Sequence, residues 1–350
     1  MELGSKIRSL RLRAGMTQEM LAEELGVSFQ TISKWENGVC APDIMMLPKL
    51  SVYFGVTIDE LFDLTTDQKL HRIENMLDLE SELPHSTFVE TIDYLQGLLE
   101  KDCDKGRINS FFAHVYHHRM ASDSEKAAKY AKKAMQIRPD IKDCYWILQK
   151  AEGAAICDWN SKQHNKTIAF YKELIKNNPE VAWNYLRLLD NLLADNRIKE
   201  AKEYLTKYTA LDGQVERQVI IYQGRILLAE HQADLAEQKF MELKKFEKDG
   251  NAMFALADYY ASQCEYDKAA QYYDISFERD KENGVKPLYT DALEGMAMIY
   301  EIQGKYEEAI KCYDRIIKVL AEAFGYTEGA PVDEVNVEKQ RVMDLMRKGL

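Results

Sequence analysis

Proline, glycine, paired cysteines and long apolar runs are all scarce in this sequence. Only 7 prolines and 17 glycines occur among 350 residues, while alanine, leucine, lysine, glutamate and tyrosine are plentiful, so we predict an all-α fold. The 6 cysteines are scattered without a Cys-x-x-Cys pair, which argues against a disulfide scaffold or a zinc site and favours reduced thiols. The chain also lacks a secretory signal and the roughly 18 consecutive apolar residues of a membrane span, so we expect a cytoplasmic protein.

Basic residues are also fewer than acidic ones, which gives a formal net charge of −12. Taken alone, this balance argues against a nucleic-acid-binding protein. Electrostatic attraction depends, however, on where charges lie rather than on their sum. Arg8, Arg11 and Arg13 lie close together near the N-terminus, and most of the acidic excess lies downstream.

Motifs that carry catalysis or bind cofactors are missing. The chain has no P-loop, G-x-S-x-G, H-E-x-x-H or G-x-G-x-x-G motif, so we expect neither an enzyme nor a cofactor. His114, His117 and His118 have a helical spacing that can hold a metal. No cysteine or carboxylate cluster lies nearby in the sequence, so we interpret them as surface or inter-repeat residues and predict no metal site.

Three zones follow one another along the chain. We predict short helices with tight turns for residues 1–64 and a helical linker for residues 65–105. For residues 106–350 we predict a ladder of paired helices. The joint is expected to be a helix that carries Leu70, Ile73 and Leu77 on one face,.

The first zone contains a helix-turn-helix pattern at residues 17–38. Thr17 and Ser28 can cap successive helices, and Gly26 between them suits the left-handed conformation that ends the first helix. We expect Val27 to fill the corner and Asn37-Gly38 to end the second helix. The apolar faces of the two helices are formed by Leu21, Ala22, Leu25, Ile32 and Trp35,.

These residues resemble the XRE or Cro-type repressor family, with Pro42-Asp43, Phe54-Gly55-Val56 and residues 58–62 matching its later helices. The resemblance covers residues 4–64 and implies a five-helix repressor-like domain. Pro48 departs from the family pattern, because proline inside a helix removes a backbone hydrogen bond. We therefore expect a kink or a late-starting helix there.

The resemblance also implies that residues 28–36 form the helix that reads operator DNA. Gln30 can pair with adenine, Phe29 or Thr31 can contact a thymine methyl, and Lys34 can reach guanine or phosphate. Arg11 and Glu36 form a salt bridge in the family. The alternative is that these polar residues form an ordinary solvated face. The predicted DNA-binding residues are Arg11, Arg13, Gln18, Ser28, Phe29, Gln30, Thr31, Ser33, Lys34 and Asn37.

An internal period marks the rest of the chain. Small or polar anchor residues recur at Ala127, Thr167, Ala201, Ala236, Ala269 and Ala309, and Pro139 and Pro179 follow the first two. This pattern resembles the tetratricopeptide repeat, which builds a superhelix with a concave groove. By register, groove candidates are Asn109, Tyr116, Arg119, Asn160, Asp190, Arg225 and Asp258, unless they are ordinary solvated residues.

The two modules together resemble the peptide-responsive quorum-sensing regulators of the Rgg and PlcR type. This resemblance implies a cytoplasmic homodimer that binds a double-stranded DNA operator and a signalling peptide or protein in the repeat groove. The alternative is a constitutive protein–protein interaction scaffold that is targeted to DNA and has no ligand switch.

Overall fold

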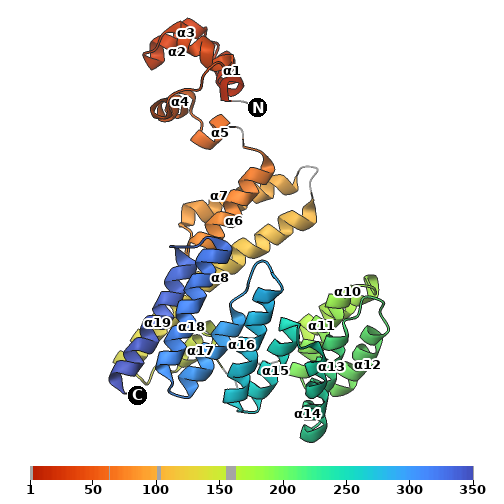
Figure 1. Cartoon of the computed structure of the whole chain (residues 1–350). Coiled ribbons are helices and arrows are strands. Elements are labelled where there is room, and N and C mark those ends of the chain that lie inside the picture. The colour runs from red at the N-terminus through yellow and green to blue at the C-terminus, as the bar shows by residue number, and fades with distance from the viewer. Residues whose placement is uncertain (1–2, 63, 101–103, 155–162, 350) are drawn as a thin grey trace. The chain divides into compact units, whose positions relative to one another are not determined.

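The computed structural model describes residues 3–62, 64–100, 104–154 and 163–349, and every regular element in these ranges is helical (Figure 1). The all-α prediction is confirmed. Contacts divide the chain into two compact units, Met1–Asp78 with Leu83–Val115 and Leu79–Glu82 with Tyr116–Leu350. Within the described ranges, no helix has both the length and the apolar character that crossing a membrane requires.

The first unit begins with the predicted five-helix domain, which is drawn in red and orange-brown in Figure 1. Its helices are α1 (Leu3–Arg13), α2 (Gln18–Leu25), α3 (Phe29–Glu36), α4 (Leu47–Phe54) and α5 (Ile58–Phe62). The predicted apolar faces of α2 and α3 are buried in one core, which is completed by residues of the other three helices. That core consists of Ile7, Leu10, Leu21, Ala22, Leu25, Ile32, Trp35, Leu50 and Leu61.

Local residues fix the turns of this domain as predicted. The Thr17 side chain accepts a hydrogen bond from the Met20 amide, and Ser28 accepts one from the Thr31 amide. Gly26 ends α2 with φ +69°, a left-handed conformation that a residue without Cβ adopts freely,. These three residues set the direction in which α3 leaves α2.

Pro48 starts a helix and does not break one. The 3-10 turn η1 (Ile44–Met46) precedes it, and Pro48 lies in the first turn of α4. An amide at that position has no acceptor within its own helix, so proline loses nothing there. The expectation of a late-starting helix is confirmed.

The rest of the first unit is a small helical cluster. It contains α6 (Thr66–Leu79), α7 (His85–Leu99) and the beginning of α8 (Lys105–Ile137). Leu70 and Ile73 of α6 are buried against Leu95 of α7 and Phe111 of α8, and Leu77 packs against the same core. The predicted apolar face of α6 is therefore confirmed.

The second unit is an array of antiparallel helices, and from α10 to α19 each helix packs against the next (Figure 1). Two cores run through it, one beneath α10–α13 and one beneath α13–α19. After the second half of α8, its elements are α9 (Lys142–Ala151), α10 (Asn165–Asn177), α11 (Ala182–Ala194), α12 (Ile198–Thr209), α13 (Glu216–Ala229), α14 (Ala233–Met241), η3 (Glu242–Phe246), α15 (Gly250–Ser262), α16 (Tyr266–Glu282), α17 (Asp291–Ile302), α18 (Tyr306–Val319), η4 (Leu320–Phe324) and α19 (Ala330–Lys348).

Four of the six predicted anchors are buried alanines that let neighbouring helices approach closely. Ala201, Ala236, Ala269 and Ala309 all have no exposed surface. The fifth was placed wrongly, because Thr167 is exposed and its neighbour Ile168 fills the anchor position instead. A one-residue error of this kind turns a helical position by about 100° and exchanges the inner face for the outer one.

The earliest predicted repeat is not a helix pair. Its two parts belong to the single continuous helix α8, in which Ala128 is buried and the predicted anchor Ala127 is half-buried. The physical reason is the absence of a helix breaker: no glycine or proline occurs between Gly106 and Pro139,.

The turns inside the later repeats hold the chain in a left-handed conformation. Asn196, His231, Cys264 and Gly304 each lie five positions before a buried alanine, with φ of +56°, +61°, +57° and +68°. Only the last of them is glycine, although this conformation costs other residues about 1–2 kcal/mol.

We therefore expect His231→Gly to stabilise the second unit by up to about 1 kcal/mol, because glycine relieves the left-handed strain but gains freedom in the unfolded chain. Urea unfolding followed by circular dichroism measures this change. The matched control is Gln232→Gly, one residue later at φ −99°, where glycine relieves no such strain and should not stabilise. Equal effects at the two positions would contradict the strain argument.

Candidate nucleic-acid interface and ligand groove

Helix α3 presents a polar surface on a firmly packed base. Ile32 and Trp35 hold it in the domain core, whereas Phe29, Gln30 and Lys34 are exposed. A helix buried on one side and open on the other can enter the major groove of B-DNA and offer side chains to base edges. In the described part of the chain, nothing forms an ion pair with Lys34, so its ammonium group is available for a phosphate or a guanine.

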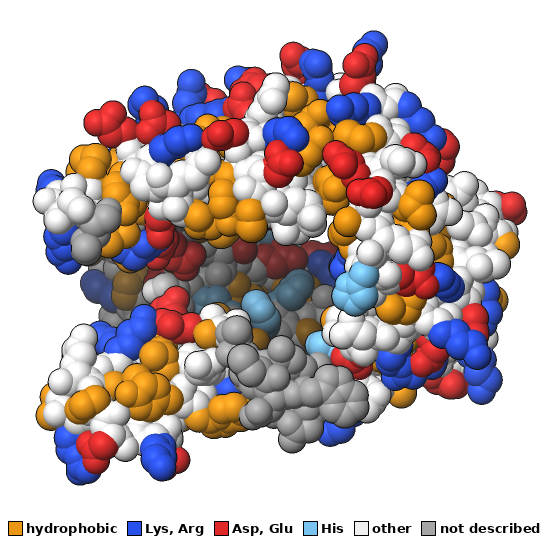
Figure 2. Space-filling view, turned by 90° about the horizontal axis from the view of Figure 1, so that it is seen from below, with side chains coloured by type: hydrophobic (Ala, Val, Ile, Leu, Met, Phe, Trp, Pro, Cys, Tyr) orange, Lys and Arg blue, Asp and Glu red, His pale blue; other side chains and the backbone are white. Residues whose placement is uncertain are grey.

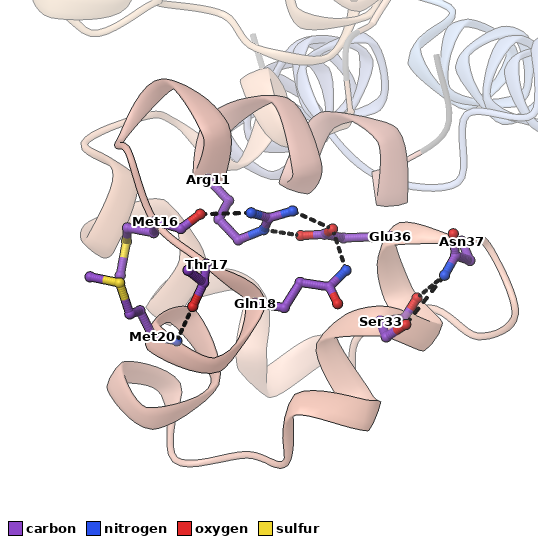
Figure 3. Close-up of polar contacts among 8 residues, drawn as sticks. All are labelled: Arg11, Met16, Thr17, Gln18, Met20, Ser33, Glu36 and Asn37. Atoms are coloured by element: carbon purple, nitrogen blue, oxygen red, sulfur yellow. Dashed lines mark hydrogen bonds and ion pairs between the residues drawn. The ribbon is translucent and has the colours of Figure 1, made fainter.

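A buried ion pair ties the end of α3 to α1 (Figure 3). The Arg11 guanidinium donates to both carboxylate oxygens of Glu36, from Nε at 2.6 Å and from a terminal nitrogen at 2.8 Å. Its other terminal nitrogen donates to the Met16 carbonyl at 2.7 Å. Gln18 donates its amide to the same Glu36 carboxylate at 2.8 Å. These hydrogen bonds therefore join α1, the start of α2 and the end of α3.

This arrangement corrects one predicted DNA contact. Arg11 was among the predicted DNA-binding residues, but it is buried and its three guanidinium nitrogens are engaged within the domain. We assign it the structural role that the family resemblance implied. Arg13, two positions later, is exposed and can reach a phosphate,.

The other predicted residues lie at the ends of the two helices. The Ser28 and Thr31 hydroxyls are 2.9 Å apart at the start of α3, and the Asn37 amide donates to the Ser33 carbonyl at its end. Gln18 begins α2, where free backbone N–H groups favour anions. The polar residues that could meet DNA are thus already positioned in the protein alone.

Hydrogen bonds also set the ionisation of Glu36. Its burial acts in the opposite direction, but the donors Arg11 and Gln18 outweigh burial and lower the pKa of Glu36 below its ordinary value of 4.5. The carboxylate is therefore charged at neutral pH, as the bidentate geometry requires.

Gly4 is a residue that the sequence analysis missed. A Cβ at this position of α1 would lie 1.9 Å from the Trp35 carbonyl oxygen and 3.3 Å from the Cα of Glu36. Only glycine lets α1 come this close to the C-terminal end of α3. The sequence signal was weak, since a single glycine near a chain end has many explanations.

In the second unit, two of the predicted groove residues come together. The Asp190 carboxylate on α11 accepts hydrogen bonds from the Tyr222 hydroxyl at 2.8 Å and from Arg225 at 2.7 Å, both on α13, and Arg187 donates to its other oxygen. Burial, with the neighbouring Asp190 charge, raises the pKa of Tyr222, so its hydroxyl remains a donor. Arg225 is thus already paired.

Asp258 extends this row to the next repeat and accepts a hydrogen bond from the Tyr273 hydroxyl at 2.5 Å. Asp190, Arg225 and Asp258 each lie eleven positions before a buried alanine, so they occupy one register on successive helices. The equivalent position on α17, eleven residues before buried Ala309, is occupied by Met298, which is 60% exposed. Met298 was not among the predicted groove residues, because the polar character that marked the other candidates is absent from its side chain.

The remaining groove candidates have different surroundings. Asn109 belongs to the first unit, and its amide donates to the Lys105 carbonyl of its own helix. Tyr116 is exposed on α8, where Arg119 pairs with Asp123 at 3.0 Å. Asn160 lies outside the described residues.

The histidines of α8 show no metal-binding geometry. The His118 ring lies 2.6 Å from the Glu80 carbonyl oxygen, and no group of three or more ligating side chains occurs in the ranges that the structure covers. Figure 2 shows acidic and histidine side chains together within the hollow on the face seen from below.

Comparison with known proteins identifies both modules. A helix-turn-helix family model matches residues 7–61, and a tetratricopeptide repeat model matches residues 290–319. Among solved structures, Bacillus thuringiensis PlcR in complex with the peptide PapR7 and DNA aligns with 97% of this chain and 98% of that chain. The identity is 12% and the TM-score 0.29, so the likeness has no bearing on function.

Two curated relatives share the N-terminal region. The HTH-type transcriptional activator BcrR of Enterococcus faecalis is 36% identical over 100 residues, which are 29% of this chain and 45% of BcrR. The chain therefore spans less than half of that relative. An HTH-type transcriptional regulator of Methanocaldococcus jannaschii is 38% identical over 64 residues, which are 18% of this chain and 97% of the relative. With the positioned α3 and the family match, these findings show that the chain belongs to the helix-turn-helix transcriptional regulators.

Proposed function

We propose that this regulator binds a specific operator as a cytoplasmic homodimer and that a peptide in the groove of the second unit modulates its affinity for DNA. A lone helix-turn-helix domain contacts a short site. Two copies on half-sites about one helical turn apart supply the specificity that a regulator needs.

The DNA-reading proposal depends on one observation: α3 is fixed on its buried side and exposes polar side chains on the other. Its base is fixed by the buried core and by the Arg11–Glu36 pair, while Gln30 and Lys34 remain exposed and unpaired by described residues. A rigid helix that offers an amide and an ammonium group can distinguish adenine and guanine in the major groove. We infer that Gln30 reads a base and that Lys34 contacts a guanine or a phosphate.

The repeat unit supports the ligand proposal through the row formed by Asp190, Arg225, Asp258 and Met298. These residues share one register on α11, α13, α15 and α17, so they line one face of the array. Such a row offers charged side chains and, at Met298, an apolar side chain to an extended peptide,.

We expect Gln30→Ala to weaken operator binding by about 1–3 kcal/mol and to relax the preference for one base. Lys34→Ala should weaken binding as well, and if Lys34 contacts a phosphate the salt dependence should fall by about one charge. Fluorescence anisotropy with a labelled operator, selected by genome-wide mapping of bound sites, measures both changes across salt concentrations.

The matched controls are Gln149→Ala and Lys142→Ala, which remove the same chemical groups from exposed positions of α9. Neither control should change operator affinity. If both α3 variants bind as tightly as the wild type at every salt concentration, α3 does not read the operator.

A further inference from the structure

The end of the array formed by α17, α18 and α19 contains an open groove of about 620 Å³. Buried Tyr313 and Ile316 of α18 and Val335 of α19 are among its lining residues. Met298 and Ile302 are 60% and 64% exposed on α17. Because they are four residues apart, they lie on the same face of the helix and form a continuous apolar strip in the groove.

The lining of the groove is strongly acidic around this strip. Glu294, Glu301, Glu334 and Glu338 line it, and Arg341 is the only cation among the lining residues. The Arg341 guanidinium donates to both oxygens of Glu301, at 2.9 and 2.7 Å, and to Glu338 at 2.8 Å. The single positive charge is therefore already neutralised by two of the four carboxylates.

The remaining two carboxylates differ in what they contact. Glu294 accepts a hydrogen bond from the Thr290 hydroxyl at 2.7 Å. Within the described ranges, no side chain or backbone group donates a hydrogen bond to Glu334. Partial desolvation by its surroundings and the nearby Glu125 charge raise the pKa of Glu334, although His118 acts in the opposite direction. Glu334 thus stands beside an apolar strip without a cationic partner.

We propose that this groove binds a peptide that covers Met298 and Ile302 with apolar side chains and places a lysine, an arginine or a free amino group against Glu334. An exposed apolar strip in a groove marks a binding surface, and an unpaired carboxylate at its edge selects a cation. The inference deepens the proposed function by naming the chemical class of the modulating peptide, and it rests on that function.

The charges that line the groove favour this occupant over a second copy of the chain. An isologous contact between two such grooves would bring the same carboxylates together, and juxtaposed like charges oppose association. A cationic peptide instead relieves the excess negative charge that Glu334 and Glu294 leave in the groove.

Three fluorescein-labelled heptapeptides test the proposal by anisotropy with the full chain. The first combines leucine and phenylalanine with two lysines, the second replaces the lysines by glutamates, and the third replaces the apolar residues by serines. We expect saturable binding of the first alone, weakened by salt. Saturable binding of the glutamate peptide with equal affinity, or of none of the three, would overturn the proposal.

Variants locate the binding. Met298→Ser should weaken binding of the first peptide about tenfold, as expected when one apolar side-chain contact is lost. Glu334→Gln should weaken it about two- to fivefold, the range for one partly exposed ion pair. Glu307→Gln removes an exposed carboxylate of α18 outside the groove and should change nothing. If Met298→Ser and Glu334→Gln both bind as the wild type does, the groove is not the site.

Operator affinity measured with the first peptide separates this inference from the proposed function. Peptide binding that follows the variants, but leaves operator affinity unchanged, would contradict modulation of DNA binding and retain the groove assignment. An operator response to a peptide that ignores Met298 and Glu334 would retain modulation and reject this groove.

Discussion

Arg11→Met is expected to destabilise the N-terminal domain by about 3–5 kcal/mol, the usual cost of removing one partner from a buried ion pair. The Glu36 side chain is 1% exposed, so water cannot replace the two hydrogen bonds that Arg11 donates. The Met16 carbonyl also loses its donor. Because the pair joins α1 to the end of α3, its loss should weaken operator binding as well.

Hydrogen–deuterium exchange of the full chain measures this effect separately for each unit, since amides of α1–α3 report on the local opening of that domain. The matched control is Arg138→Met, which breaks the exposed pair with Asp140 and should cost less than about 1 kcal/mol. The double variant Arg11→Met/Glu36→Leu should recover much of the stability, because no unpaired charge remains buried. Similar losses in Arg11→Met and Arg138→Met would refute the structural role of Arg11.

The same pair gives the domain a defined response to acid. Folding lowers the pKa of Glu36 below 4.5, so its contribution to stability is complete above the unfolded-state pKa and is lost as the pH falls through the folded-state pKa. Exchange protection of α1–α3 should therefore decline under acid conditions. This decline should be smaller in Glu36→Gln, which has no charge to lose at that position.

The sequence predicts the helix-turn-helix domain well because its decisive residues act on their immediate neighbours. Thr17 and Ser28 bond to amides three positions away, Gly26 ends its own helix, and Pro48 starts its own. Signals of this kind depend on a few consecutive residues and need no knowledge of tertiary contacts.

The repeat array was predicted less accurately where the period is weak. Ile168 replaces the expected small anchor, and α8 continues through a position where the period requires a turn. In each case the local sequence predicts the structure better than the repeat period does. Ile168 has the apolar character of a buried position, and α8 lacks a helix breaker. Where the repeat units are degenerate, a prediction based on the period alone therefore misplaces buried positions and turns.

The groove shows a different limit of sequence reasoning. Register places Asp190, Arg225 and Asp258 in one row, but it cannot reveal that Asp190 and Arg225 already pair with each other. Whether a charged side chain is free for a ligand depends on the neighbouring helix. Met298 and Glu334 become candidates only when the contacts of their neighbours are known.

Gly4→Ala is expected to have the second large effect, although alanine is ordinarily the better helix former. Alanine at an open helical site stabilises by about 0.5–1 kcal/mol relative to glycine. Here its Cβ would meet the Trp35 carbonyl oxygen at 1.9 Å and the carbonyl carbon at 3.0 Å. These are backbone atoms, so no side-chain rotation can relieve the contact, and α1 must move away from α3.

We expect a net loss of about 1–3 kcal/mol or more, the range for overpacked contacts, together with weaker operator binding. Gly97→Ala in α7 is the matched control, because no neighbouring atom lies within 4 Å of its added Cβ, and it should stabilise slightly. Exchange of α1–α3 amides and operator anisotropy measure both variants. A stabilised Gly4→Ala protein would show that α1 is not held against the end of α3. The opposite signs of the two substitutions would instead show that Gly4 is required for close approach, because helix propensity alone predicts the same sign for both.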